Sequence, residues 1–353
     1  MEKLEIYLEW AVKENASDIF FVAGTPVSIK KDGRLAGFNE EKMMPGDLKT
    51  LVEAIYEKAA RPMDLFLESG DDDFSFAIGS LARFRVNTYR QRGSLAAVIR
   101  IVHFNIPDWR SVGIPEQVIR LADLTSGMVL VTGTAGSGKS TTEACIIEEI
   151  NATRDCHIIT LEDPIEYLHR NRRGIVSQRE IAIDTKDSLS GLRACLRQAP
   201  DVIQLGEMRD LETIRTAMTA AETGHLLLAT LHTRGAVNTI DRIIDSFPPE
   251  QQNQIRIQLG GVLHTVVCQQ LLPGIDGGRV PAFEIMHMTN AVKSLIRDAK
   301  THQIDNAIAA GAADGMISMD QSIFALCKAG KISVETALAH AYNAEQLKRR
   351  LGR

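Results

Sequence analysis

The sequence has little of what marks several large protein classes. Its five cysteines are widely spaced and never form a C-x-x-C pair, so a disulfide framework or a zinc cluster is not supported, and they are expected to be small core residues in a reducing compartment. No apolar run approaches the roughly 18 residues of a membrane-spanning helix, and the first ten residues lack the apolar core of a secretory signal. A net charge of -5 gives no overall basic field for nucleic acid or anionic lipid. These absences favour a soluble, cytoplasmic protein.

The most specific chemical signal is the glycine-rich stretch VTGTAGSGKSTT at 131–142. The spacing Gly133-x-x-x-x-Gly138-Lys139-Ser140 is that of a phosphate loop, whose backbone N–H groups and following helix N-terminus surround an anion. Lys139 is expected to reach the β and γ phosphates of ATP, and the Ser140 hydroxyl to ligate Mg²⁺. The remaining expected ATP-binding residues are Thr134, Ala135, Gly136, Ser137 and Thr141. A plain flexible turn is the alternative, but an apolar strand-like run precedes the loop and a helical pattern follows it.

From residue 127 onward, apolar strand-like runs alternate with helical patterns. The runs lie at 127–133, 156–163, 200–207 and 224–233, and the helices at 139–151, 187–199 and 210–222. Such runs, apolar on both faces, predict a mainly parallel sheet covered on both sides. Ligands gather at the carboxyl ends of such strands. The residues that close the runs are therefore candidates for a site: Glu162, Asp163, Glu207, His232 and Thr233.

These candidates match the needs of ATP hydrolysis, which is mostly positioning and electrostatics. Glu207 is predicted to polarise the attacking water or to act through Mg²⁺, and Glu162 and Asp163 to join Ser140 and Glu207 around the metal. His232 is a candidate contact of the γ phosphate. The alternatives are that Glu207 is an ordinary exposed acid and that His232 is a structural histidine. Glu162 and Asp163 have an alternative of their own, because they precede Pro164 and would suit the N-terminus of a helix.

The first hundred residues predict a small α+β unit. Helices are expected at 4–15 and 47–60, and strands at 74–78, 83–89 and 95–102, with a hairpin turn at Asp32-Gly33. The segment HFNIPDWRSVGIP has no periodicity, so we expect a linker there. The predicted organisation is a domain at 1–105, a linker at 106–113 and a second domain at 114–353.

Four ordered motifs give the sequence a family resemblance: ITLEDPIEYLH (159–169), GEMRDLETI (206–214), TAAETGHLLLATLHT (219–233) and TIDRIIDSFP (239–248). They resemble the secretion and pilus assembly ATPases, most closely the PilT-type retraction ATPases of type IV pili. The resemblance implies an α/β fold in which a PAS-like N-terminal domain precedes a RecA-like P-loop ATPase domain with a helical C-terminal part. It also implies a homo-hexameric motor that hydrolyses ATP to retract pili in twitching motility. Such a motor would work at the cytoplasmic face of the inner membrane, held there by a pilus platform protein.

The resemblance also assigns roles to residues that the patterns leave open. Arg85 and Arg100 match arginines of the family's N-terminal domain that reach nucleotide phosphates, although a solvated basic face is the alternative. AVKSLIRDAK (291–300) resembles the retraction signature of the family, whereas the pattern alone predicts an amphipathic helix. The four-cysteine zinc site of the extension-type relatives has no counterpart, which favours retraction.

Several departures leave alternatives open. Thr134-Ala135 replaces the usual Pro-Thr of the loop, and Gln204 stands in an apolar strand. An accessory motor, or a paralogous assembly ATPase of a type II secretion pseudopilus, would carry the same motifs. A RecA-like nucleic-acid motor is a remote alternative, because VSQREIAIDTKDS carries mixed rather than basic charge and no nucleic-acid partner is expected. A nucleotide-gated scaffold without turnover is disfavoured by the presence of Lys139 and Glu207.

Overall fold

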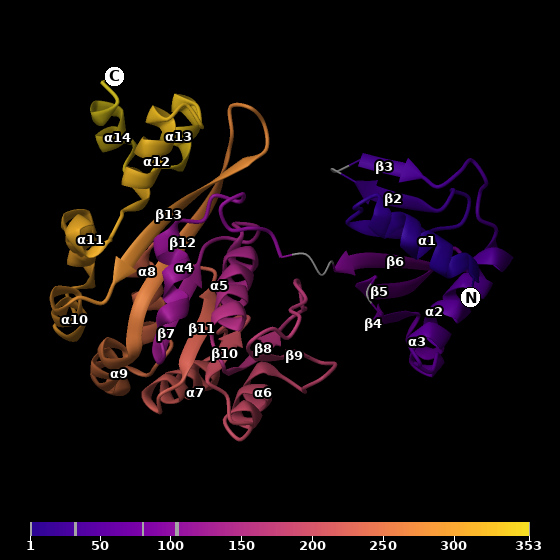
Figure 1. The fold of residues 1–353 in the computed structure, drawn as a ribbon, viewed down its shortest axis with the longest axis horizontal. Coiled ribbons are helices and arrows are strands. Elements are labelled where there is room, and N and C mark those ends of the chain that lie inside the picture. The colour runs from indigo at the N-terminus through magenta and orange to yellow at the C-terminus, as the bar shows by residue number, and fades with distance from the viewer. Residues whose placement is uncertain (1, 32–33, 80, 103–105, 353) are drawn as a thin grey trace. The chain divides into compact units, whose positions relative to one another are not determined.

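The structure is a computed structural model that describes residues 2–31, 34–79, 81–102 and 106–352. The chain divides into two compact units (Figure 1). The first comprises Met1–Asn105 with the short segment Glu166–Leu168, and the second comprises Ile106–Ile165 with His169–Arg353. Each unit has its own buried apolar core.

The first unit is a six-stranded antiparallel sheet with helices packed on one face. Its elements in chain order are α1 (Glu2–Lys13), β1 (Asp18–Phe21), β2 (Ser28–Lys31), β3 (Arg34–Gly37), α2 (Pro45–Lys58), α3 (Asp64–Ser69), β4 (Asp71–Ile78), β5 (Ala82–Gln91) and β6 (Ser94–Val102). The sheet order is β3-β2-β1-β6-β5-β4. Period-two alternation decides the buried face, because Phe84 and Val86 of β5 are buried whereas Arg83 and Arg85 point to the other side.

The predicted elements of this unit are present, with shifted ends. Both predicted helices begin and end about two residues earlier than expected, and β4 begins three residues before the predicted start at 74. The strands β2 and β3 pair with Lys31 opposite Arg34, as a hairpin requires, whereas the predicted turn residues Asp32 and Gly33 lie outside the described residues. Strand β1 was not predicted from the sequence, because its four residues are too short for a periodic signal.

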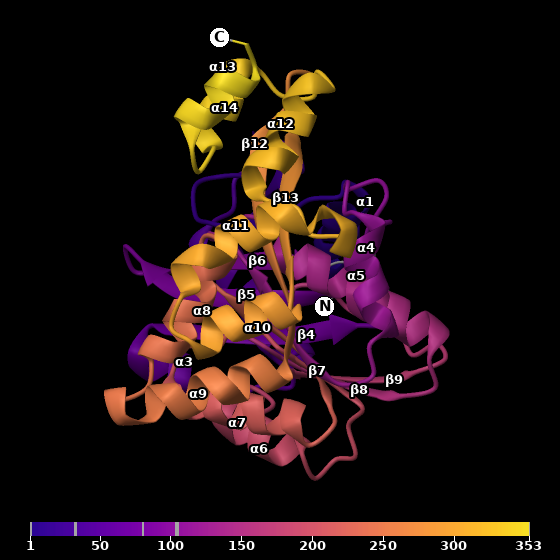
Figure 2. The same ribbon diagram turned by 90° about the vertical axis from the view of Figure 1, so that its left-hand side faces the viewer.

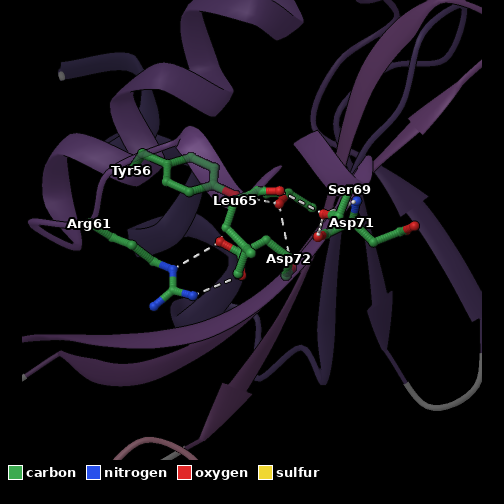
Figure 3. A network of polar contacts seen from close by, with 7 residues as sticks. Tyr56, Arg61, Leu65, Ser69, Asp71 and Asp72 are labelled. Atoms are coloured by element: carbon green, nitrogen blue, oxygen red, sulfur yellow. Dashed lines mark hydrogen bonds and ion pairs between the residues drawn. The ribbon is translucent and has the colours of Figure 1, made fainter. Parts of the chain in front are cut away.

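A buried ion pair links α2 and the following loop to the edge strand β4 (Figure 3). The Arg61 guanidinium donates two hydrogen bonds of 2.9 Å to the Asp72 carboxylate, and the Tyr56 hydroxyl donates a third of 3.0 Å. Asp72 is only 5% exposed. Burial by itself raises the pKa of Asp72, but the hydrogen bonds from Arg61 and Tyr56 outweigh it and the net pKa is lowered. The carboxylate therefore stabilises the folded first unit when it is charged.

We expect Asp72→Asn to lower the free energy of unfolding of the first unit by roughly 1–3 kcal/mol at neutral pH, the cost of losing hydrogen bonds to a charged group. Because the folded pKa is depressed, this stabilisation is present above the unfolded pKa of about 3.9 and is lost as the pH falls through the folded pKa. The difference between variant and wild type should thus shrink below about pH 4. Denaturant unfolding followed by Trp10 fluorescence in a Trp109→Phe background measures it. Asp73→Asn, on the exposed side of β4, is the matched control and should change stability little.

The second unit is built on a seven-stranded sheet of order β13-β12-β7-β11-β10-β8-β9. The strands are β7 (Gly127–Thr132), β8 (His157–Glu162), β9 (Ile175–Glu180), β10 (Val202–Leu205), β11 (Leu226–Leu231), β12 (Leu263–Pro273) and β13 (Arg279–His287). All neighbours are parallel except β12 and β13, which pair antiparallel. The prediction of a mainly parallel sheet is confirmed, and β9, β12 and β13 extend it.

Helices cover both faces of this sheet (Figure 1). Alternate strand residues enter different cores: Leu130 and Ile203 lie in one cluster with Ile214 of α7, and Val129 and Val202 lie in another with Ile146 of α5. The helices and 3₁₀ segments up to β12 are α4 (Glu116–Ile119), η1 (Arg120–Asp123), α5 (Lys139–Thr153), α6 (Ser188–Cys195), α7 (Leu211–Glu222), α8 (Ala236–Asp245) and α9 (Pro249–Val262). Helix α6 ends four residues before the predicted end at 199, because Ala199 has a φ of 50° and Pro200 follows it.

Short helices follow β13 and complete the second unit (Figure 2). They are α10 (Asn290–Arg297), η2 (Thr301–Gln303), α11 (Ile304–Ala310), η3 (Gly311–Asp314), α12 (Met319–Lys328), α13 (Val334–His340) and α14 (Ala344–Arg350). Helix α10 packs on α9, and α12 packs on β13. Among the described residues, no helix is long and apolar enough to cross a membrane. Of the five cysteines, three are buried in cores, whereas Cys156 and Cys327 are partly exposed and pack against the edges of those cores.

Candidate nucleotide site

The glycine-rich loop forms a backbone cradle between β7 and α5. Its glycines have φ angles of 147° at Gly133, 74° at Gly136 and 92° at Gly138, which side chains with a Cβ rarely adopt. A Cβ on Gly133 would lie 2.4 Å from the Gln269 carbonyl oxygen, and one on Gly138 would lie 2.8 Å from the Gln269 side-chain nitrogen. The loop geometry therefore requires glycine at these positions. The loop ends where α5 begins at Lys139, so the first N–H groups of the helix face the cradle.

Lys139 is held over this loop. Its Nζ donates hydrogen bonds of 3.0 Å to the carbonyl oxygens of Gly133 and Thr134 and lies 3.3 Å from His232 Nδ1. The residue is 8% exposed. Ser137 Oγ is buried and has no hydrogen-bond partner among the described residues. A buried hydroxyl without a partner and a buried ammonium beside a glycine cradle fit a triphosphate, which would accept hydrogen bonds from both.

The carboxyl ends of the strands bring the predicted acids and His232 to the same edge as Lys139. Glu207 follows β10, and its Oε1 lies 3.5 Å from His232 Nε2. Its other oxygen accepts a 2.7 Å hydrogen bond from Arg209 Nε, and Arg209 Nη1 lies 3.8 Å from Asp163 Oδ2. A continuous polar chain thus runs from Lys139 through His232, Glu207 and Arg209 to Asp163. Arg209 was not singled out from the sequence, although it stands two residues after Glu207.

Glu162 is positioned differently from the other predicted acids. Its Oε1 accepts hydrogen bonds from Thr160 Oγ1 at 2.6 Å and Gln178 Nε2 at 3.0 Å, which turn it toward the neighbouring strand β9. No helix begins after Pro164, so the alternative that Glu162 and Asp163 cap one is wrong. Among the described residues, no three His, Cys, Asp or Glu side chains are grouped to hold a metal ion by themselves. A Mg²⁺ ion at Ser140, Glu162, Asp163 and Glu207 therefore stays a prediction. Mg²⁺ usually takes one or two carboxylates, with substrate phosphates and waters as the other ligands, so the residues present fit such an ion.

Two features explain how the loop is supported. The Thr142 hydroxyl on α5 donates a buried 2.7 Å hydrogen bond to Gln269 Oε1 on β12, which ties the helix after the loop to the strand beside it. The Gln204 side chain, polar in an otherwise apolar strand, donates at 3.1 Å to the buried Glu143 carboxylate. Gln204 therefore anchors the same helix and is compatible with an intact sheet.

A cavity of about 470 Å³ opens beside the loop in the second unit. Its lining includes Gly113, Ile114, Gly138, Thr141, Leu271 and Pro281. No sequence pattern predicts this cavity, because its walls come from five separate segments of the chain. Its volume suits a nucleoside, and it adjoins the helix start at which a phosphate would bind.

The two predicted arginines lie in the first unit. Arg85 on β5 and Arg100 on β6 are directly opposite each other in the antiparallel ladder. Two like charges in such a pair repel each other, and Arg100 is partly neutralised by Asp18, whose Oδ1 lies 3.1 Å from Arg100 Nε. Binding of a further anion beside Arg85 and Arg100 would therefore be favourable.

Comparisons with known proteins identify the family of this chain. The model of the type II/IV secretion system protein family matches residues 2–322. The chain is 42% identical to the "Type IV pilus retractation ATPase PilT" of Pseudomonas aeruginosa, over 94% of this chain and 95% of that protein. It is 37% identical to the "Type IV pilus ATPase PilU" of the same organism, over 98% of this chain and 90% of the relative.

A solved structure gives the same result. The crystal structure of the pilus retraction motor PilT with bound ADP aligns with a TM-score of 0.90 at 42% identity, and the alignment covers 98% of each chain. These findings confirm the resemblance inferred from the four sequence motifs. The chain belongs to the type II/IV secretion system protein family.

Proposed function

We propose that this protein is the ATPase motor that retracts a type IV pilus. The observation that carries the proposal is the polar chain from Lys139 to Glu207 at one edge of the parallel sheet, beside a glycine cradle that fits a triphosphate. Its likeness to PilT over nearly the whole chain supports retraction as the work that hydrolysis drives. The proposal includes the finer fold assignment, a PAS-like first unit and a RecA-like second unit, and a ring of six copies.

The residues divide the chemistry of ATP hydrolysis among them. Lys139 neutralises the β and γ phosphates. Glu207 orients the attacking water and accepts the proton that this water loses. His232 lies between the two and is suited to contact the γ phosphate. Mg²⁺, held by Ser140 with the nearby carboxylates, supplies charge that offsets the phosphate oxygens. We assign the base and ribose of ATP to the cavity of about 470 Å³ beside Gly138 and Thr141.

The partner and location follow from the proposed work. A retraction motor acts on an assembly anchored in the inner membrane, so we propose contact with a pilus platform protein at its cytoplasmic face. An accessory motor is the second candidate, because it would carry the same sequence motifs. Loss of twitching in cells without this gene, restored by the wild-type gene but not by Lys139→Ala, tests retraction. Normal retraction without the gene, together with measurable ATP hydrolysis in vitro, would favour the accessory role.

Coupling of hydrolysis to retraction is tested on α10, which carries the signature-like segment. Its Val292 and Ile296 are fully buried, whereas Leu295 is partly buried against the same core. Leu295→Asp is expected to impair pilus retraction while leaving ATPase activity measurable in a folded protein, because the helix is remote in sequence from the phosphate loop and its acids. Ala291→Asp, exposed at the start of the same helix, is the matched control. Normal retraction frequency in the Leu295 variant contradicts the assignment of this segment.

The arginines of the first unit are proposed to supply further positive charge to the transition state. We expect Arg85→Ala or Arg100→Ala to lower ATPase activity by roughly one to three orders of magnitude, with much less effect on ATP affinity. Steady-state phosphate release and nucleotide titration give the two quantities. Arg90→Ala removes the same charge from an exposed position on β5 and should leave both unchanged. Full activity in both test variants would refute the proposed role of these arginines in hydrolysis.

A further inference from the structure

A buried carboxylate in the second unit joins two helix starts. Glu284 on β13 is 2% exposed. Its Oε1 accepts a 2.8 Å hydrogen bond from the Ala236 N–H, and its Oε2 accepts one of 3.3 Å from the Met319 N–H. Ala236 is the first residue of α8, and Met319 is the first residue of α12. One side chain therefore satisfies a free N–H group at the N-terminus of each of two helices.

The first of these helices directly follows the loop that carries His232. That loop, residues 232–235, leaves β11 at Leu231, whose carbonyl accepts a 3.3 Å hydrogen bond from the Gly133 N–H of the phosphate loop. At its other end, Gly235 has a φ of 84°, and a Cβ there would lie 3.7 Å from Glu284 Oε1. The loop is thus held at one end by the phosphate loop and at the other by Glu284.

A second set of buried contacts ties the same loop to the end of β7. The Thr233 and Thr239 hydroxyls are 2.7 Å apart, and Thr239 Oγ1 lies 3.5 Å from Thr132 Oγ1. The Thr132 hydroxyl donates to Cys268 Sγ at 3.1 Å, and Thr132 directly precedes Gly133. The residues around His232 and those that begin the phosphate loop therefore belong to one polar network.

A buried carboxylate is costly unless its hydrogen bonds are satisfied. Burial raises the pKa of Glu284, and the N–H groups of Ala236 and Met319 oppose that shift. As a carboxylate it accepts from both helices, one through each oxygen. A glutamine has the same size but offers a single acceptor, because its second terminal atom is an amide nitrogen.

We propose that Glu284 is a positioning residue for ATP hydrolysis, which fixes the 232–235 loop over the phosphate loop and links it to α12. The inference rests on the proposed ATPase function and deepens it. A movement of His232 when the γ phosphate leaves would pass through Ala236 and Glu284 to the start of α12. The C-terminal helices would in this way respond to the state of the nucleotide.

The test compares Glu284→Gln with Asp187→Asn in the full-length protein. Asp187 is a matched control, because its carboxylate also accepts a backbone N–H at a helix start, that of Ser190 in α6 of the same unit. We expect Glu284→Gln to lower kcat roughly tenfold to a hundredfold with KM and the Kd for ATP changed less than about threefold. Asp187→Asn should leave kcat near the wild-type value.

A second variant breaks the contact from the other side. Ala236→Pro deletes the N–H that Glu284 accepts, and proline is tolerated at the first position of a helix. Gly235 has a ψ of 150°, as the residue before a proline prefers. We expect this variant to show the same fall in kcat as Glu284→Gln. Hydrogen exchange of the Ala236 amide should be faster in Glu284→Gln than in wild type and unchanged in Asp187→Asn.

The outcomes separate this inference from the proposed function. Wild-type kcat in Glu284→Gln, or an equal fall in Asp187→Asn, overturns the positioning role. If Glu284→Gln changes KM, ATP affinity and the thermal midpoint as strongly as it changes kcat, Glu284 is a purely structural residue. That result overturns the positioning role as well. If the wild-type protein binds ATP without hydrolysing it, the proposed function fails. Hydrogen exchange then tests by itself whether Glu284 links the 232–235 loop to α12. Faster exchange of the Ala236 amide and of α12 in Glu284→Gln supports this link, and unchanged exchange at both overturns it.

Discussion

Lys139→Ala is expected to abolish tight ATP binding. The ammonium group is buried at the mouth of the glycine cradle, where Gly133 and Thr134 carbonyls and His232 surround it. Its charge would be shared among the oxygens of the β and γ phosphates, where water is excluded and charge-assisted hydrogen bonds are strong. We expect the Kd for ATP to rise by roughly 10²-fold or more. Titration with a fluorescent ATP analogue measures the change.

The control for this variant is Lys186→Ala, which removes the same charge from an exposed position in the second unit. Its affinity for ATP should equal that of the wild type. Circular dichroism and thermal unfolding must show that Lys139→Ala is folded, because Lys139 is also the first residue of α5. A folded Lys139→Ala protein with wild-type ATP affinity would contradict the phosphate-loop assignment.

Glu207→Gln is expected to separate ATP binding from hydrolysis. The substitution keeps the size of the side chain but removes the charge that lies 3.5 Å from His232 and 2.7 Å from Arg209. ATP binding should survive, since the phosphate loop is intact, and kcat should fall by roughly 10²-fold or more because the attacking water loses its base. Phosphate release under saturating ATP, with the Kd measured separately, gives both values.

Two further variants identify the acid. Glu212→Gln changes an exposed glutamate at the start of α7, which makes only surface ion pairs with Arg193 and Arg215, and should leave kcat unchanged. Glu162→Gln tests the acid that accepts hydrogen bonds from Thr160 and Gln178. Unchanged turnover in Glu207→Gln together with a large loss in Glu162→Gln would move the water-orienting role to Glu162.

Local chemistry was readable from the sequence. The spacing from Gly133 to Ser140 predicts the cradle, because positive φ angles and close approach of the backbone are properties of glycine at single positions. The buried faces of β5 and of the parallel strands follow from period-two alternation and from continuous apolar runs. The edge at which Glu207, Asp163 and His232 meet follows from a topological rule that places ligands at the carboxyl ends of parallel strands.

Contacts between distant segments were decided by the tertiary structure. Nothing near Glu284 in sequence indicates that its carboxylate accepts the N–H groups of Ala236 and Met319, which are 48 and 35 residues away. The cavity beside Gly138 is likewise formed by five segments, and the antiparallel β13 joins the sheet through its hairpin with β12. Periodicity specifies which face of an element is buried, but not which element packs against it. The glycine-loop geometry was therefore predictable from the sequence alone, whereas the contacts that hold the loop in place depended on how the strands and helices pack.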